Sequence, residues 1–510
     1  MFSDRSAGLL LHPTSLPGPF GSGDLGRNAR DLVDFLAAAG IRFWQVLPLG
    51  PVGAGDSPYS GTSVFAGNPW LVSLDSLVEA GLLPSDAEEL QPKASTRNCD
   101  FGAAKELRER ALRRAYSQFE SLPRSADFES FVAGNAYWLD DFATYAALKR
   151  QFNDGPFFDW PEPYRRRDRQ ALESFRRDAA REIAFHKFVQ WRFFRDLNEL
   201  SAYAKSRGVR LMGDAPIYVA HDSCDVWAHP ELFLLGPSGE PRSVAGVPPD
   251  AFSDEGQLWG NPLYNWDVLE GTGFGFFLAR LALMFKSLDC VRLDHFIGFT
   301  RYWAIPREAK TAKDGVFHDV PGEAFFATVF RELGEVPLIA EDLGVLTPRV
   351  KAMRDHFNLP GMNILQFSFS PDRGAEASRP HRYRRHSVVY TGTHDNDTSV
   401  GFFQGPPDNA SASAVASYQG ERAFALEYLG LPKTADAREA ARALVRACFA
   451  SPVNTAIVPA QDLLELGRET RMNRPGIAAG NWGFRVQPGE LTPELAAQVR
   501  RSLELYGRLG

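Results

Sequence analysis

Cys290-Val-Arg-Leu-Asp-His-Phe is a short apolar run that ends abruptly in charged and polar residues. Pro337-Leu-Ile-Ala-Glu-Asp-Leu-Gly and Val388-Val-Tyr-Thr-Gly-Thr-His-Asp have the same pattern, so Asp294, Glu341 and Asp395 all stand at or just after the end of such a run. This pattern is typical of a buried parallel strand that delivers a side chain to the mouth of a barrel. The gaps between the three acids leave room for a loop, a helix and another strand.

Similar runs recur along the whole chain and predict the fold. They cover residues 7–12, 42–48, 209–214, 290–294, 337–341, 363–367, 387–393 and 455–461. Eight strands are what a closed (β/α)₈ TIM barrel of the α/β class needs. An open doubly wound sheet is the alternative, but no glycine-rich phosphate turn follows any of these runs.

The spacing of the runs is uneven, which predicts insertions. Between the second and third runs, residues 103–122, 129–151 and 167–207 have helical composition and periodic apolar residues. We therefore expect a single catalytic barrel domain over residues 1–510, with a largely helical insertion at 75–200. Residues 218–267 are rich in Pro, Gly and Trp, and we expect an irregular insertion there that forms a wall of the substrate site.

Composition narrows the possible partners. The net charge is −7 and no block of basic residues occurs, which argues against nucleic acid and anionic membranes. No signal-peptide pattern and no apolar stretch of membrane-spanning length are found. The four cysteines are scattered without CxxC spacing, which favours reduced thiols in a cytoplasmic protein. Aromatic residues make up 12% of the chain; because sugar faces are apolar and stack on such rings, a neutral carbohydrate polymer fits better.

Two carboxyl groups could divide the work of glycoside chemistry, in which one attacks or stabilises the anomeric carbon and another moves the proton. Arg292 lies two residues before Asp294, so both side chains point to the same face of a strand and the guanidinium should hold the carboxylate ionised. Glu341 ends its apolar run, whereas Asp342 should point the opposite way. A general acid must be protonated when it acts, so burial and neighbouring carboxylates should raise the pKa of Glu341. Each acid could instead form a structural ion pair at the barrel rim.

Further polar residues gather at the same predicted rim. His394 and Asp395 could bind sugar hydroxyls, and Asp214 ends the run Leu211-Met-Gly-Asp. His, Asp and Asn are also metal ligands, so a metal-dependent barrel enzyme remains an alternative. No cluster has convincing metal spacing, and we expect neither a metal nor another cofactor.

Two aromatic residues lie in polar, glycine-bearing segments. Tyr59 stands in Gly53-Ala-Gly-Asp-Ser-Pro-Tyr-Ser-Gly, and Trp259 stands in Gly256-Gln-Leu-Trp-Gly-Asn-Pro. Aromatic rings in such loops either pack against the hydrophobic core or stack on bound sugars. We expect them to reach the mouth of the barrel from opposite sides.

Taken in order, these segments resemble the 4-α-glucanotransferases, also called amylomaltase or disproportionating enzyme, of the α-amylase superclan. The resemblance runs from residue 5 to about 486 and is specific as a set, although Ala-Glu-Asp-Leu-Gly alone is a weak motif. The matching stretches are Gly8-Leu-Leu-Leu-His-Pro-Thr-Ser-Leu-Pro-Gly-Pro-Phe, Asp56-Ser-Pro-Tyr, Phe65-Ala-Gly-Asn-Pro, Gly213-Asp-Ala-Pro-Ile-Tyr-Val-Ala-His-Asp-Ser, Val244-Ala-Gly-Val-Pro-Pro-Asp, Gly256-Gln-Leu-Trp-Gly-Asn-Pro-Leu-Tyr, Arg292-Leu-Asp-His-Phe, Ala340-Glu-Asp-Leu-Gly, Thr393-His-Asp-Asn-Asp-Thr, Gln461-Asp-Leu-Leu and Gly480-Asn-Trp.

The resemblance implies a retaining two-step transfer between α-1,4-glucans or maltooligosaccharides, with glucose also serving as an acceptor. By that resemblance Asp294 is the nucleophile, Glu341 the acid/base and Asp395 the transition-state stabiliser. Substrate contacts are implied for Arg292, His394, Asp214 and Tyr59. It also implies a (β/α)₈ barrel with inserted subdomains and no separate C-terminal β-sandwich.

Two positions depart from the family pattern. After Gly246-Val-Pro-Pro-Asp the family usually has Tyr, whereas this chain has Ala251, in a loop thought to order the acceptor. Before Gly480-Asn-Trp the family tends to have a Gly-Thr turn, whereas this chain has Gly476-Ile-Ala-Ala. The first departure bears on the range of products and not on the chemistry.

A plain α-glucan hydrolase would use the same three acids, and a catalytically dead glucan-binding protein would not need them all.

Overall fold

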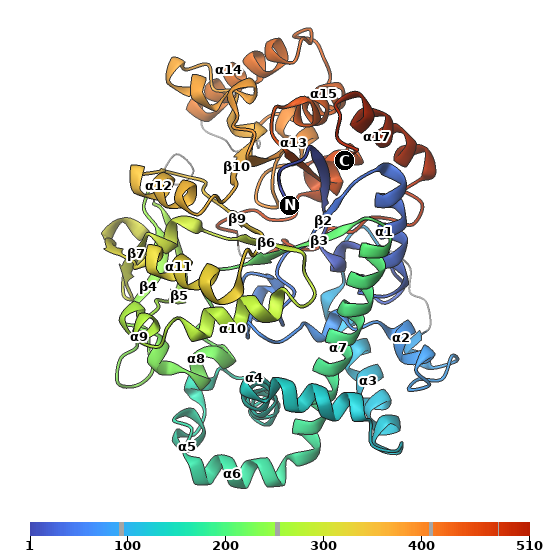
Figure 1. The fold of residues 1–510 in the computed structure, drawn as a ribbon, viewed down its shortest axis with the longest axis vertical. Helices are drawn as coiled ribbons and strands as arrows, with labels where there is room; N and C mark the ends of the chain where they lie inside the picture. Colours follow the sequence, from blue (N-terminus) through green and yellow to red (C-terminus); the bar gives the residue numbers. More distant parts are fainter. Residues whose placement is uncertain (91–95, 250–254, 407–411, 478, 510) are drawn as a thin grey trace.

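The computed structural model describes residues 1–90, 96–249, 255–406, 412–477 and 479–509. Its centre is an eight-stranded parallel sheet in the order β10-β11-β12-β1-β2-β3-β6-β9. Figure 1 shows these strands in the middle of the molecule with helices around them. The strands are β1 (Ser6–Leu10), β2 (Phe43–Gln45), β3 (Arg210–Ala215), β6 (Cys290–Leu293), β9 (Leu338–Ala340), β10 (Gly361–Ile364), β11 (Ser387–Tyr390) and β12 (Thr455–Pro459).

The two end strands of this sheet meet, so the sheet closes as a barrel. The backbone N–H of Ala340 in β9 donates to the carbonyl of Pro360, directly before β10, at 2.9 Å. The predicted (β/α)₈ architecture is therefore confirmed, and each of the eight strands falls within or overlaps a predicted run. The strands are buried on both faces, as their nearly continuous apolar sequences require.

Helices surround the barrel and extend from it. In chain order they are α1 (Arg27–Ala39), α2 (Leu74–Glu79), α3 (Phe101–Glu120), α4 (Ala126–Gln151), α5 (Glu162–Arg165), α6 (Arg169–Asp178), α7 (Ala180–Ser206), α8 (Cys224–Ala228), α9 (Trp266–Gly271), α10 (Gly275–Met284), α11 (Gly322–Leu333), α12 (Pro348–His356), α13 (Ser399–Gln404), α14 (Ala412–Tyr428), α15 (Ala437–Ala450), α16 (Ala460–Leu463) and α17 (Pro493–Leu505).

Several of the helices between β2 and β3 begin at a capping side chain. Asp100 accepts the N–H of Ala103 at the start of α3, and Ser125 accepts the N–H of Phe128 at the start of α4. The segment 167–207 is helical, as its composition predicts, but it forms two helices, because the chain breaks at Ala179 into α6 and α7. The break lets α6 turn across the end of the molecule, where Phe175 packs against Tyr164, while α7 runs back to the barrel (Figure 1).

A second sheet lies beside the barrel and was not predicted. Its antiparallel order is β5-β4-β7-β8, formed by β4 (Ser243–Val247), β5 (Gln257–Pro262), β7 (Arg301–Pro306) and β8 (Val316–Asp319). The expectation that 218–267 is irregular is thus wrong for β4 and β5. The glycines and prolines of this segment disguise a strand pattern, and the strands are stabilised by pairing: β5 pairs with β4, and β4 pairs with the distant β7. Ala251 lies outside the described residues.

The four cysteines, Cys99, Cys224, Cys290 and Cys448, carry free thiols, as expected. Within the described ranges, no helix is both long enough and apolar enough to cross a membrane.

Arg508 ties the C-terminal segment to the barrel. Its guanidinium is completely buried and donates to the Ser451 hydroxyl at 3.3 Å and to backbone carbonyls, some of them at the C-terminal end of α15, where a cation is favourable. The acceptors are the carbonyls of Phe449 at 2.6 Å, Ser6 at 2.9 Å, Asn454 at 3.0 Å, Ser451 at 3.1 Å and Val453 at 2.9 Å.

Arg508→Met should lower the free energy of unfolding by about 3 kcal/mol, because it removes several hydrogen bonds from a buried cation to backbone carbonyls. Urea unfolding followed by circular dichroism measures the change. Arg500→Met is the matched control, since Arg500 is 48% exposed and pairs only loosely with Glu504 at 3.8 Å. The control should cost below about 0.5 kcal/mol. Equal midpoints for the two variants would contradict the role of Arg508.

Candidate active site

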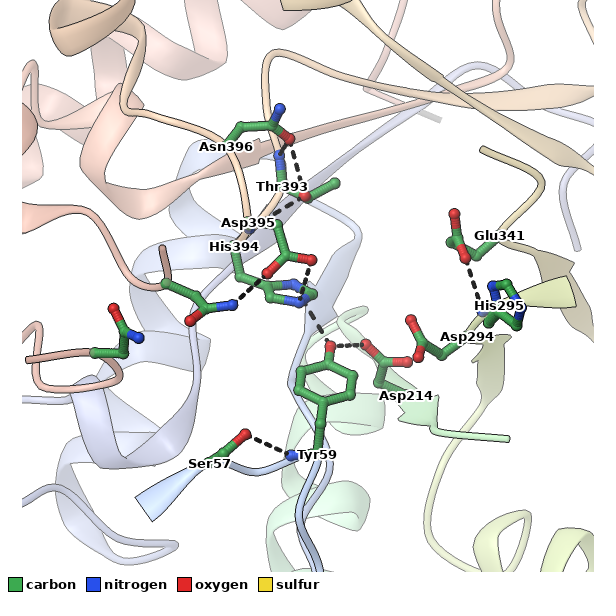
Figure 2. Close-up of polar contacts among 12 residues, drawn as sticks. Ser57, Tyr59, Asp214, Asp294, His295, Glu341, Thr393, His394, Asp395 and Asn396 are labelled. Carbon is green, nitrogen blue, oxygen red and sulfur yellow. Dashed lines mark hydrogen bonds and ion pairs between the residues drawn. The ribbon is translucent and has the colours of Figure 1, made fainter. Parts of the chain in front are cut away.

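Four strands of the barrel deliver polar side chains to one mouth. Asp214 stands near the end of β3, Asp294 follows β6, Glu341 follows β9, and the segment after β11 carries His394 and Asp395. Figure 2 shows these side chains converging, with Asp214 beside Asp294 and with Tyr59 between Asp214 and His394. The structure therefore brings together acids that are far apart in the sequence.

Arg292 links three of these groups. Its side chain is buried, and it donates to Asp214 Oδ2 from Nη2 at 2.8 Å and from Nε at 3.0 Å. The same Nη2 donates to Asp294 Oδ1 at 2.8 Å and to the Tyr59 hydroxyl at 3.1 Å. The prediction that Arg292 and Asp294 share a face of the strand is confirmed.

The pKa of Asp294 is set by opposing effects. Desolvation in the barrel mouth raises the pKa of Asp294 to about 6; Arg292 opposes this shift, while Asp214 adds to it. Arg292 therefore favours the ionised carboxylate, as expected, but does not outweigh the desolvation. At pH 7 the ionised form still predominates, because the pH lies above this pKa.

Glu341 has the protonation expected of a general acid. Desolvation and the neighbouring Asp294 raise the pKa of Glu341 well above its usual value. The carboxyl is held in place by two backbone donors, the N–H of His295 at 2.7 Å and the N–H of Leu343 at 3.1 Å. Asp342 points elsewhere, as predicted, and pairs with Arg354 at 2.5 Å.

Asp395 is held by groups that the sequence did not identify. Desolvation alone would raise the pKa of Asp395, but His394, whose Nε2 lies 3.3 Å from Oδ2, and the side chain of Asn473, which donates to Oδ1 at 2.6 Å, shift it below the usual range. Arg471 donates to the Asp395 carbonyl at 2.5 Å. Asn473 and Arg471 follow no strand-like run, so only the polar composition of Arg471-Met-Asn-Arg could have indicated them.

Tyr59 is more firmly fixed than its glycine-bearing loop suggested. Its hydroxyl donates to Asp214 Oδ2 at 2.7 Å, and its ring stacks on the His394 ring with centroids 4.9 Å apart. Trp482, which the sequence analysis quoted only as part of a motif, lies against both rings, 5.8 Å from Tyr59 and 5.9 Å from His394. Tyr59 is therefore part of the charged network as well as a wall of the mouth.

Trp259 approaches from the side of Glu341. It lies on β5 and not in a loop, is 38% exposed, and packs edge-on against His295 with ring centroids 4.9 Å apart. His295 has a φ of 51°, a left-handed conformation that costs free energy and is frequent at functional sites. No ring contact joins Trp259 to Tyr59 among the described residues, so the two aromatic groups border different parts of the mouth.

The arrangement pairs a carboxyl that is mostly ionised at pH 7 with one whose pKa is raised well above its usual value, and both lie near one guanidinium. Such a pair can supply a nucleophile and a proton donor to the same bond. In the part of the chain that the structure describes, no group of three or more His, Cys, Asp or Glu side chains is arranged to hold a metal ion.

Comparisons with known proteins agree with this chemistry. A family model described as 4-alpha-glucanotransferase matches residues 11–492. A 4-alpha-glucanotransferase of Thermus thermophilus is 46% identical over 99% of both chains, and a chloroplastic/amyloplastic one of Solanum tuberosum is 39% identical over 99% of this chain and 87% of its own. The structure of amylomaltase from Streptococcus agalactiae in complex with acarbose superposes with a TM-score of 0.92, at 35% identity and 99% coverage of both chains.

Proposed function

This chain belongs to the 4-alpha-glucanotransferase family and has that activity, and from this premise we propose how its residues carry out the transfer. The reaction is a retaining double displacement in which Asp294 is the nucleophile, Glu341 the acid/base and Asp395 the stabiliser of the transition state. The observation that supports these roles is the geometry: Arg292 donates to Asp294 at 2.8 Å, while two backbone N–H groups hold Glu341, whose pKa is raised well above its usual value.

In the first step Glu341 donates its proton to the glycosidic oxygen while an oxygen of Asp294 bonds to the anomeric carbon. The bond from that carbon to the glycosidic oxygen breaks, and the released glucan leaves with a free 4-hydroxyl. The donor segment remains as an ester on Asp294. Arg292 and Asp214 hold the Asp294 carboxylate in place through the hydrogen bonds described above.

In the second step Glu341, now a carboxylate, takes the proton of the acceptor 4-hydroxyl, and that oxygen displaces Asp294 from the anomeric carbon. A new α-1,4 bond forms and Asp294 returns to the carboxylate state. Retention predicts that the two carboxyl groups lie about 5–5.5 Å apart in the sugar complex. Asp395 and His394 would bind ring hydroxyls, and Tyr59 and Trp259 would pack against sugars.

We propose maltooligosaccharides and longer α-1,4-glucans as donors and acceptors, with glucose as a further acceptor. Acarbose occupies the Streptococcus agalactiae amylomaltase, which supports this substrate class. We also propose that residues 75–200 and 218–267 act as inserted subdomains of a single barrel domain, with 218–267 forming a substrate wall. The free thiols support a cytoplasmic location.

Incubation with maltotriose, followed by separation of the products, tests the substrate proposal. Transfer should give glucose together with a ladder of longer oligosaccharides. The hydrolase alternative would give only glucose and maltose, and that result would overturn the proposal.

The pH dependence of transfer should follow the two carboxyl groups. The first step needs ionised Asp294, so kcat/KM should fall about tenfold per pH unit below pH 6, the pKa of that group. On the alkaline side the rate should fall where Glu341 loses its proton, well above its usual pKa. Initial rates on maltotriose between pH 4 and 9 measure both limbs. A rate that stays constant down to pH 4 would contradict the assignment of Asp294.

Tyr59→Ala should raise the share of hydrolysis several-fold, because it removes the ring that lies on His394 and lets water reach the glycosyl-enzyme. Tyr59→Phe keeps the ring and removes only the hydroxyl bonds to Asp214 and Arg292. It should therefore keep the product partition while lowering the rate. The ratio of glucose released to oligosaccharide formed distinguishes the two effects, and an unchanged ratio in Tyr59→Ala would place acceptor control elsewhere.

A further inference from the structure

Arg280 of α10 is a buried cation that the mechanism above does not use. It is 5% exposed, and its Nε is buried without a hydrogen-bond partner. Among the described residues, no ion pair, hydrogen bond or cation–π contact involves its guanidinium. An arginine keeps its charge in a protein, and an isolated buried charge is costly. Some group that is not a neighbouring side chain must therefore solvate it.

Asp214 offers the complementary unpaired group. Its Oδ2 accepts from Tyr59 and Arg292, whereas its Oδ1 is buried and has no partner. Arg280 and Asp214 both line one cavity of about 100 Å³ that also borders Tyr59. The rest of its wall is largely apolar and includes Leu283, Met284 and Leu288.

The size of this cavity indicates its occupant. About 30 Å³ per water molecule gives room for roughly three waters. A water can accept from the guanidinium on one side and donate to Asp214 Oδ1 on the other. A water between these two groups has the polar partners that an ordered water needs, and the rest of the wall is apolar.

We propose that Arg280 is a positioning residue of the catalytic centre, which holds Asp214 through ordered water in this cavity. Asp214 in turn orients Arg292, and Arg292 orients Asp294. Arg280 thus acts on the nucleophile through Asp214 and Arg292, from a helix outside the barrel strands. The inference rests on the proposed role of Asp294.

The charge of Arg280 also acts on the acids of the site. The groups that interact electrostatically with it are Tyr264, Asp225, Asp214 and Asp294. Asp225 is not a fixed counter-charge, because burial raises its pKa to about 7. Loss of the Arg280 charge should therefore make Asp294 harder to ionise.

Asp294 itself is surrounded by groups from four other elements or loops. Arg292 favours its charged form, as does His394, whereas Asp214 and Asp395 oppose it. Glu341 also faces Asp294, and the two charges repel each other, which raises the pKa of Glu341. Loss of Arg280 removes one of the cations that favour the ionised form of Asp294, and no neighbouring side chain replaces it.

The test is the pH profile of kcat/KM on maltotriose for Arg280→Met and Arg280→Lys. Arg280→Met should lower kcat about tenfold, leave KM within about twofold and move the acid limb up by about half a pH unit or more. Arg280→Lys keeps the charge and should restore most of the acid limb. Met284→Leu, in the wall of the same cavity, is the matched control and should not move it.

Several results would overturn the inference. One is a wild-type acid limb in folded Arg280→Met. Another is a dry cavity, or a direct Arg280–Asp214 contact, in a high-resolution crystal structure of the wild-type protein, which also decides the matter if Arg280→Met does not fold. A third is a saturable rise in the thermal midpoint with chloride that is absent in Arg280→Met, since this would make the occupant an anion. Failure of the proposed function is distinct: in that case Asp294→Asn would remain active.

Discussion

Asp294→Asn should lower the rate of transfer from maltotriose by at least about 10³-fold, because the amide cannot form the ester with the anomeric carbon. The change keeps the shape of the side chain and removes its charge. The contact that Arg292 makes at 2.8 Å would then be to an amide oxygen, so the surrounding network should survive. Quenched-flow or chromatographic assay of glucose release measures the loss.

Two measurements separate this effect from misfolding. The variant should bind a maltooligosaccharide within a few-fold of wild-type affinity by calorimetry and should have the wild-type thermal midpoint. Asp319→Asn is the matched control, since Asp319 lies on the exposed β8 with its side chain 78% accessible. The control should retain full activity. Turnover by Asp294→Asn that approaches the wild-type rate would show that another group attacks the sugar.

Glu341→Gln should lower transfer from maltotriose by about 10²–10⁴-fold, because no protonated carboxyl remains to assist the leaving glucan. The same variant should consume α-glucosyl fluoride far faster than maltotriose, since fluoride leaves without a proton. Breakdown of the glycosyl-enzyme should then become slow, because no carboxylate at position 341 remains to take the proton of the acceptor hydroxyl. The ratio of the two rates is the measurement.

The comparison has its own control and its own contrary outcome. Glu335→Gln changes an exposed carboxyl in the segment that leads into β9, close in sequence to Glu341. It should leave both rates unchanged. If Glu341→Gln were equally slow with both substrates, the proton donor would be a different residue. Its pH profile should also lose the alkaline limb that the raised pKa of Glu341 predicts.

Much of the fold could be predicted because its signals are local. A buried parallel strand needs a short apolar run, and the run alone marks β6, β9 and β11. Side chains alternate between the two faces of a strand. Arg292 and Asp294, two residues apart, were therefore expected on one face, and Asp342 was expected to point away from its neighbour Glu341. The strands β4, β5, β7 and β8 were missed because pairing across the chain, and not local composition, stabilises them.

Local sequence patterns were enough to predict the eight strands of the barrel and to place Asp294, Glu341 and Asp395 at or just after strand ends. Each of these features depends on residues a few positions apart. Tertiary structure decided which distant groups meet there: Asn473 on Asp395, Tyr59 between Asp214 and His394, and Arg280 behind Asp214. It also decided the pKa of Asp294, which rises to about 6 although an arginine touches the carboxylate. The physical reason is that desolvation and long-range contacts depend on how loops close over the barrel, which no local pattern of residues encodes.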